Sequence, residues 1–337
     1  MKMFGLAGAA LAAWLVGMVS AHAADPINVY TIWPENYARP MFQEFEKQTG
    51  IKVNFLRFSS GEALARVMAE KNNPRIDVLF GGPVETFAAG IKEGIFASYK
   101  SPSFDKLPAR FKQPDGMWTA IADDPLVFMT NGAFLKTNNL KPPASWDDLL
   151  NPAYKNGLQM ADARTSGTAV TRIFSVLEVN GRNEDKAFDY LKKLRQNVQV
   201  YTKSGGGGTL PTGLGQAAGG IFFIVDALET KAKGYDVVIS FPKEGIGTAA
   251  EAIALIKGAK NPDGAKKLID FATSPAMQSK LAEYKVNFVP AHPDVKTEAS
   301  LAEVLKDAKI FPIDEDYAGA NRKRIIERWV KEVLPAQ

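Results

Sequence analysis

Hydroxyl groups gather at Thr165-Ser166-Gly167-Thr168, directly ahead of a segment whose apolar residues recur with helical spacing. That spacing predicts a helix over 168–179, so the four residues lie at its N-terminus. The first N–H groups of a helix are unpaired and its dipole favours negative charge, which suits an anion. Ordinary capping by Ser or Thr is the alternative. The pattern leaves both interpretations open.

A second polar loop, 203–209, contains four consecutive glycines. Glycine lets a backbone approach a ligand closely and present several N–H donors, so we expect Ser204, Gly206, Gly207 and Thr209 to contact a ligand. A nucleotide-binding loop would need Gly-Lys-Ser/Thr at its end, whereas here Lys203 precedes the glycines. A dinucleotide-type match at 213–218 follows a loop instead of a strand, and a flexible linker over 204–209 is another alternative.

Few residues could support catalysis. The sequence has no Cys, and His292 is the only His after residue 22, in a stretch typical of a surface turn. A His-rich zinc site or a Cys nucleophile therefore cannot be built, and no Gly-x-Ser-x-Gly elbow accompanies His292. Carboxylate chemistry through Asp123-Asp124 or Glu244 stays open. We expect no enzyme, no cofactor and no metal site, with a carboxylate-dependent periplasmic enzyme as an alternative.

The elements that must position these loops alternate between strand and helix. The first half predicts strands at 27–32, 51–56 and 75–80, with helices at 40–48 and 61–71. This order favours a largely parallel sheet, and such sheets bind ligands beyond the carboxyl ends of their strands. Loops at that position supply the candidate residues Trp33, Ser59, Ser60, Gly81 and Gly82.

The second half repeats this alternation and predicts a second lobe. We expect the chain to cross between lobes near 123–129 and to return through a strand at 250–256. About 310 residues follow residue 23, which is more than a single hydrophobic core usually contains. The predicted division is lobe I from 24–123 with 246–337, and lobe II from 124–245.

The first residues indicate export. Lys2, an apolar run to about residue 19 and the small-x-small triplet at 21–23 predict a cleaved signal peptide over 1–23, and hence a periplasmic protein. Cleavage would lower the formal net charge from +4 to +3, with basic and acidic residues mixed along the chain. This pattern lacks the basic footprint of a nucleic-acid binder.

Several loose signatures, taken in order, resemble the extracellular solute-binding proteins of ABC importers, in the branch of ferric-ion, sugar-phosphate and aminoethylphosphonate receptors. They extend over the chain after the leader: 27–31, 50–53, 76–80, 143–155, 165–168 and 271–278. The resemblance implies a two-lobed α/β periplasmic-binding fold of type II with a two-strand hinge. It also implies a monomeric receptor that encloses a small-molecule ligand and delivers it to a cognate ABC permease.

One departure from the branch concerns the ligand. Ferric-ion members use a neighbouring tyrosine pair, but the corresponding stretch, 220–226, holds apolar residues there. We therefore expect a phosphorylated or phosphonylated metabolite, with a ferric-ion receptor and a chemosensory adaptor as alternatives. Asp124, Asp226 and Glu244 would accept hydrogen bonds from it, while Arg57, Arg164 or Lys203 could add positive charge.

Overall fold

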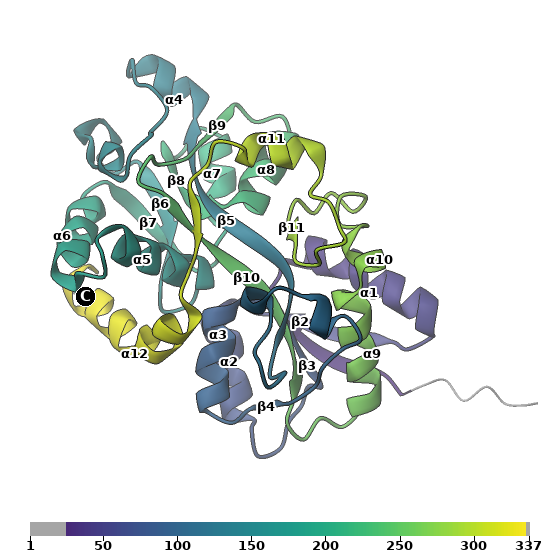
Figure 1. The fold of residues 1–337 in the computed structure, drawn as a ribbon. Helices are drawn as coiled ribbons and strands as arrows, with labels where there is room; N and C mark the ends of the chain where they lie inside the picture. Colours follow the sequence, from purple (N-terminus) through teal and green to yellow (C-terminus); the bar gives the residue numbers. More distant parts are fainter. Residues whose placement is uncertain (1–24, 335–337) are drawn as a thin grey trace, which may run out of the picture.

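The computed structural model describes residues 25–334, so the predicted signal peptide, 1–23, lies outside the described residues. Two groups of strands, each covered by helices, are joined by two long strands, β5 (Thr119–Asn131) and β10 (Ile246–Ile256) (Figure 1). All strands belong to one mixed sheet whose main order is β2-β1-β3-β10-β5-β8-β6-β7.

The first lobe is built on three parallel strands, β1 (Ile27–Thr31), β2 (Val53–Arg57) and β3 (Val78–Pro83). Strand β10 lies antiparallel between β3 and β5, and short β4 (Phe96–Ala97) pairs with it. The helices and helical turns of this lobe are α1 (Glu35–Thr49), α2 (Ser60–Ala69), α3 (Val84–Lys92), η1 (Phe104–Lys106), η2 (Ala109–Phe111), α9 (Pro262–Thr273) and α10 (Pro275–Gln278).

The second lobe pairs β5 antiparallel with β8 (Gly219–Phe223) and β9 (Val237–Ser240). Strand β8 continues the sheet through parallel β6 (Leu158–Ala161) and β7 (Val198–Thr202). Its helices and turns are α4 (Gly132–Thr137), η3 (Trp146–Leu150), η4 (Pro152–Tyr154), α5 (Gly167–Val179), α6 (Glu184–Arg195), α7 (Thr209–Gly213) and α8 (Ile224–Ala232).

Strand β5 passes from one lobe to the other. It pairs with β10 as far as Pro125 and with β8 from Leu126, and all of its thirteen residues are buried. The sequence predicted the crossover near 123–129, a shorter stretch that begins with two acids. Asp123 is nevertheless buried in the strand, where its carboxylate accepts hydrogen bonds from Thr248 Oγ1 and Arg110 Nη2.

The C-terminal segments return repeatedly to this junction. Strand β11 (Val289–Pro290) pairs with β5 and β12 (Ile310–Pro312) with β10, while α11 (Ala299–Leu305) packs on apolar residues of β5, β8 and α8. Helix α12 (Glu315–Glu332) lies along α3 and forms ion pairs with α6 (Figure 1). We retain the two lobes given above as a proposal, with these segments bridging them.

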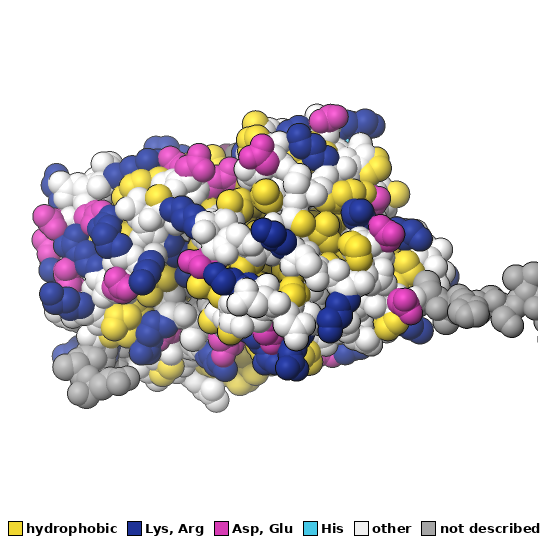
Figure 2. Space-filling model, turned by 90° about the horizontal axis from the view of Figure 1, so that it is seen from below, with side chains coloured by type: hydrophobic (Ala, Val, Ile, Leu, Met, Phe, Trp, Pro, Cys, Tyr) yellow, Lys and Arg dark blue, Asp and Glu magenta, His cyan; other side chains and the backbone are white. Residues whose placement is uncertain are grey.

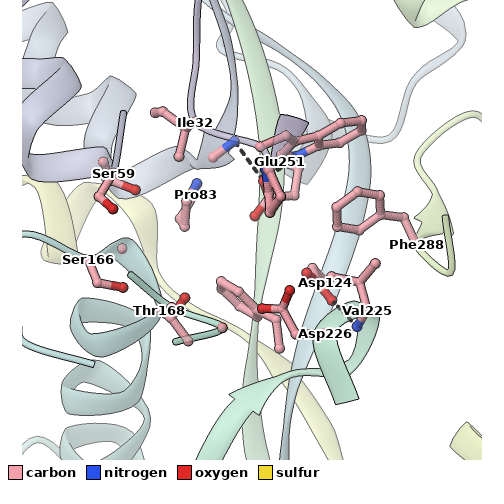
Figure 3. Close-up of a pocket in the computed structure, with 18 of the residues that line it drawn as sticks. Ile32, Ser59, Pro83, Asp124, Ser166, Thr168, Val225, Asp226, Glu251 and Phe288 are labelled. Atoms are coloured by element: carbon pink, nitrogen blue, oxygen red, sulfur yellow. Dashed lines mark hydrogen bonds between the residues drawn. The ribbon is translucent and has the colours of Figure 1, made fainter. Parts of the chain in front are cut away.

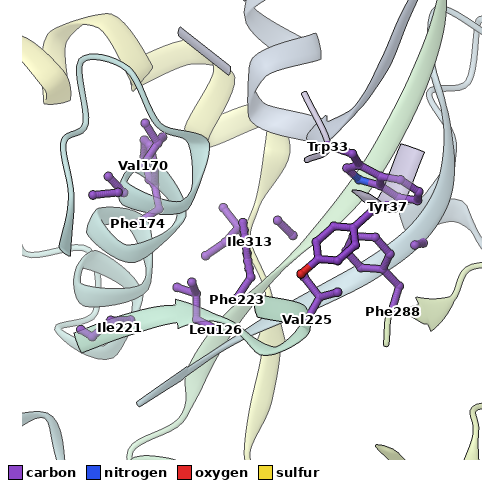
Figure 4. Close-up of a cluster of buried hydrophobic side chains, with 14 of the residues drawn as sticks. Trp33, Tyr37, Leu126, Val170, Phe174, Ile221, Phe223, Val225, Phe288 and Ile313 are labelled. Atoms are coloured by element: carbon purple, nitrogen blue, oxygen red, sulfur yellow. The ribbon is translucent and has the colours of Figure 1, made fainter. Parts of the chain in front are cut away.

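The main apolar core is continuous between the lobes. Figure 4 shows Trp33, Tyr37 and Phe288 on one side of it and Val170 and Phe174 on the other. In α1 the core residues recur with helical spacing, and Gly50 ends the helix in the left-handed conformation with φ 72°. This helix begins at Glu35, five residues before the predicted start at Pro40, so its N-terminus reaches the loop after β1.

The surface carries charges of both signs. Lys, Arg, Asp and Glu side chains are interspersed over the face shown in Figure 2. No helix among residues 25–334 has the length and apolarity to cross a bilayer.

Candidate functional site

A cavity that is partly open to solvent lies between the lobes, beside the long strands β5 and β10. Five helices begin at its wall, and each directly follows a strand: α1 after β1, α2 after β2, α3 after β3, α5 after β6 and α8 after β8. The carboxyl ends of the strands thus face the cavity, as the alternation predicted. The dipole at the N-terminus of a helix favours negative charge, so those helix starts that are not occupied by acids make the cavity attractive to an anion.

One end of the cavity is lined by neutral hydroxyl groups. Ser59 and Ser60 come from the start of α2, and Ser166 and Thr168 from the start of α5 (Figure 3). Arg57, at the end of β2, also lines the cavity, and its Nη1 donates to Ser59 Oγ over 3.3 Å. Burial lowers the pKa of Arg57, but a guanidinium remains charged in proteins. This end therefore combines one cation with several hydrogen-bond donors.

The glycine loop approaches this end through its backbone. A Cβ added at Gly205 would lie 2.1 Å from Thr168 Oγ1, and one at Gly206 would lie 2.9 Å from Asp226 Cγ. Only glycine permits so close an approach. The loop therefore brings peptide groups between the hydroxyl end and the opposite wall.

The opposite end is lined by carboxylates. Glu251, from β10, is 2% exposed, and its Oε2 accepts hydrogen bonds from Trp33 Nε1 and from the Gly82 N–H, both over 2.6 Å. Its Oε1 is buried without a partner. Burial raises the pKa of Glu251 to about 8. This group is consequently ready to accept a hydrogen bond from a ligand or to hold a proton.

Two aspartates complete the carboxylate end. Asp124, from β5, accepts the Val225 N–H over 3.4 Å, and burial together with Glu251 and Asp226 raises its pKa. Asp226, in the first turn of α8, accepts the Tyr37 O–H over 3.3 Å. Burial and the neighbouring Glu229 carboxylate raise the pKa of Asp226 to about 6. Positive charge or hydrogen-bond donors from a ligand would stabilise the ionised forms of these acids.

An aromatic wall borders the carboxylates. Trp33 stacks on Phe288 with ring centroids 4.3 Å apart and an interplanar angle of 24°. Phe288 precedes β11 and reaches the cavity from a distant part of the chain (Figure 3). This wall offers an apolar face beside two polar ends.

Of the predicted site residues, ten line the cavity: Trp33, Ser59, Ser60, Gly82, Asp124, Ser166, Gly167, Thr168, Gly206 and Asp226. Six do not: Gly81, Thr165, Ser204, Gly207, Thr209 and Glu244. The Thr165 hydroxyl donates to the Lys203 carbonyl of the neighbouring glycine loop, and the Thr209 hydroxyl donates to the Gly206 carbonyl of its own loop. Glu244 lies at another cavity, in the second lobe, where it accepts the Ser145 hydroxyl over 2.6 Å.

Of the three cations proposed as a source of charge, only Arg57 lines the cavity. Arg164 pairs with Asp162 over 2.6 Å, and Lys203 pairs with Glu62 over 2.7 Å. Sequence reasoning missed Glu251 and Phe288 as lining residues. An acid within the apolar stretch 249–256 is the signal that would have indicated Glu251.

The prediction that His292 lies in a surface turn is wrong. The residue is 1% exposed, its N–H donates to Gln278 Oε1 over 2.8 Å, and its Nδ1 accepts the Asp294 N–H over 3.2 Å. Pairing of the adjacent β11 with β5 explains this burial. Among the described residues, no three His, Asp or Glu side chains are placed to hold a metal ion.

Comparison with known proteins identifies relatives over most of the chain. A profile of bacterial extracellular solute-binding proteins matches residues 73–321. The structure resembles the periplasmic binding protein AfuA of Actinobacillus pleuropneumoniae, solved with exogenous fructose 6-phosphate, at TM-score 0.88 and 31% identity. The alignment covers 93% of this chain and 100% of that one. It confirms the predicted two-lobed α/β periplasmic-binding fold.

Other relatives differ in what their names state. An uncharacterised Haemophilus influenzae protein is 34% identical, covering 98% of this chain and 96% of its own. A putative 2-aminoethylphosphonate-binding periplasmic protein of Salmonella typhimurium is 26% identical, over 84% of this chain and 81% of its own. Apo ferric-ion-binding protein A of Pasteurella haemolytica shares the fold alone, at 21% identity and TM-score 0.76, over 92% of this chain and 98% of its own.

Proposed function

We propose, for a chain that belongs to the bacterial extracellular solute-binding protein family, that its ligand is a small organic phosphate or phosphonate. The family consists of transport proteins that bind a solute for an ABC-type importer. In this role the cavity encloses the ligand and the closed receptor presents it to a membrane permease. Export through the predicted leader, a monomeric state and the lobe boundaries are part of the same proposal.

The observation that carries the proposal is that the N-termini of α2 and α5 meet Arg57 and several hydroxyl groups at one end of the cavity. A phosphoryl or phosphonyl group has three oxygens and about two negative charges, which need several donors at once. Hydroxyls of Ser59, Ser166 and Thr168 would supply donors from both lobes, and Arg57 would supply the charge. A ligand with a single negative charge would not need so many hydrogen-bond donors at one end of the cavity.

The carboxylate end would then bind the remainder of the ligand. Glu251, Asp124 and Asp226 accept hydrogen bonds, so they fit hydroxyl or amino groups carried some distance from the phosphorus. The stacked rings of Trp33 and Phe288 would cover a carbon face between the two ends. AfuA, with fructose 6-phosphate bound, supports a ligand that has both kinds of group.

The ferric-ion alternative lacks support from the corresponding residues. Phe223 and Val225 line the cavity, and buried Phe222 stands beside them, so carbon atoms occupy the stretch in which iron-binding members carry tyrosines. Hard cations such as ferric ion need oxygen ligands. Only the buried acids support the alternative of a carboxylate-dependent enzyme, and the binding proposal already accounts for them.

Calorimetric titration of the mature protein tests the proposal. The ligands are fructose 6-phosphate, 2-aminoethylphosphonate, inorganic phosphate, putrescine and ferric citrate. We expect binding of at least one organic phosphate or phosphonate with a dissociation constant of about 1 μM or lower, which corresponds to about 8 kcal/mol. Binding of ferric citrate or putrescine without either phosphorus compound would contradict the proposal.

A further inference from the structure

The two lobes contact each other directly beside the cavity, through residues that do not line it. On one flank, the Gly61 N–H of α2 donates to the Thr165 carbonyl of the second lobe over 2.8 Å. The next residue, Glu62, pairs with Lys203 over 2.7 Å. We call these two contacts the seam. They join the start of α2 to the loops before α5 and α7.

Gly61 makes the seam possible. A Cβ built on it would lie 2.5 Å from the Arg164 carbonyl oxygen and 3.2 Å from Thr165 Cα, both in the other lobe. No positive φ is recorded for Gly61, and it lies in the first turn of a helix, so its own backbone would accept alanine. The requirement for glycine therefore comes from contact with the second lobe.

A second set of contacts lies on another part of the interface. The Tyr37 hydroxyl of α1 donates to Glu229 of α8, and Asn36 Nδ2 donates to the same carboxylate over 3.1 Å. We call this set the clasp. Tyr37 also donates to Asp226, which does line the cavity, so the clasp orients a residue of the site.

A deeper contact lies between the helices that follow the seam. Thr171 Oγ1 of α5 donates to Glu85 Oε1 of α3 over 2.7 Å, and both residues are fully buried. The Glu85 side chain faces the buried Arg322 of α12, whose Nε and Nη2 have no partner within the described residues. A hydrogen bond in such a low-dielectric interior is costly to break, which reinforces the same interface.

We propose that the seam and the clasp hold the lobes closed independently of ligand contacts, and that Gly61 and Tyr37 are positioning residues that set the closed population. The inference rests on the proposed function, in that lobe closure encloses the ligand. Ligand contacts and seam contacts involve different atoms. Their free energies therefore add in favour of the closed state. Loss of the seam lowers the affinity without altering the cavity wall, whereas loss of the Tyr37 hydroxyl also removes a hydrogen bond to Asp226, which lines the cavity.

The lobes can be followed by single-molecule fluorescence energy transfer. The sequence has no Cys, so dyes can be attached at Lys71→Cys in the first lobe and Lys155→Cys in the second, both exposed positions. We expect a detectable closed fraction in the ligand-free protein. Gly61→Ala should lower the ratio of closed to open molecules at least about tenfold, since an overpacked contact is strained only when the lobes meet.

Tyr37→Phe should lower the same ratio about threefold to tenfold, as expected for one lost hydrogen bond. The matched controls keep their contacts within one lobe. Gly132→Ala adds a methyl group at a helix N-terminus against the flexible Asp236 side chain, and Tyr99→Phe removes a hydroxyl bonded to Asp270. Both controls should leave the closed fraction unchanged.

Fructose 6-phosphate is the probe for affinity. Gly61→Ala should weaken its binding by the same factor as the closed fraction, with an unchanged melting temperature of the ligand-free protein. A wild-type protein without a closed fraction, or a Gly61→Ala variant that closes like the wild type, would overturn the inference. Failure of fructose 6-phosphate to bind would count against the proposed ligand alone, because the ligand-free arm still measures the seam.

Discussion

The two ends of the cavity are built from opposite chemistry. The end at α2 and α5 presents hydroxyls, helix N-termini and Arg57, whereas the end at β5, β10 and α8 presents Asp124, Glu251 and Asp226. One end therefore stabilises negative charge and the other stabilises hydrogen-bond donors or positive charge. The difference indicates an asymmetric ligand that enters in one orientation, with its anionic group toward α5.

The largest effect that we expect from the difference between the two ends concerns the titration of Glu251. Burial raises its pKa from 4.5 to about 8, so the folded protein takes up a proton as the pH falls through about 8. The unfolded chain takes up that proton only near 4.5, so stability on account of Glu251 rises as the pH falls between these values. Glu251→Gln cannot titrate. Its free energy of unfolding relative to wild type should therefore be greatest above pH 8 and decline by a few kcal/mol towards pH 4.5.

Urea denaturation across this pH range measures that difference. Glu244→Gln is the control, because hydrogen bonds from Ser145 and backbone N–H groups outweigh burial and lower the pKa of Glu244. Its deficit relative to wild type should disappear as the pH falls through the ordinary carboxyl range. If the free energies of unfolding of the two variants changed with pH in the same way, Glu251 would titrate like Glu244. The carboxylate end of the cavity would then have no special effect on its acids.

Arg57 tests the other end. Arg57→Met retains the alkyl stem and removes the only cation that lines the cavity among the described residues. We expect the affinity for fructose 6-phosphate to fall about 100-fold, the upper range for a charge-assisted hydrogen bond. Isothermal titration calorimetry measures the change, and Arg164→Met, which loses a pair with Asp162 outside the cavity, is the control. Equal losses in both variants would place the anion elsewhere.

The smallest expected effect concerns the hydroxyls of α5. Ser166→Ala and Thr168→Val each remove one donor from the anion end and should weaken binding about threefold to tenfold. Ser274→Ala is the matched control, since it removes a hydroxyl that accepts the Met277 N–H at the start of α10, and Ser274 does not line the cavity. Unaltered affinity in the first two variants would assign these hydroxyls to helix capping, the alternative that the sequence left open.

Sequence reasoning predicted the site best where local order and chemistry coincide. The loops at Ser59, Gly82 and Thr168 follow strands and begin helices, so their position could be inferred from neighbours along the chain. Glu251 and Phe288 were missed because their roles depend on partners far away in sequence. Glu251 bonds Trp33, which lies 218 residues earlier. The acid within the apolar stretch 249–256 marks Glu251 itself, but no local pattern identifies its distant partner.

The fold shows the same limit. Strands β1 to β3 follow simple alternation and were predicted, with boundaries that differ by a few residues. The crossover predicted near 123–129 is shorter than strand β5, and the burial of Asp123 in that strand depends on partners that are distant in the sequence. His292 was placed at the surface because its stretch is typical of a turn, although Gln278 and the pairing of β11 bury it.

The position of β10 has a consequence for how the chain reaches its folded state. This strand, residues 246–256, lies between β3 and β5 in the sheet. During synthesis the first lobe lacks a central strand until most of the polypeptide has been made. Pairing across so long a separation is slow, because a large loop must close first. We therefore expect the first lobe to complete its sheet only late in synthesis, after the whole second lobe has been made.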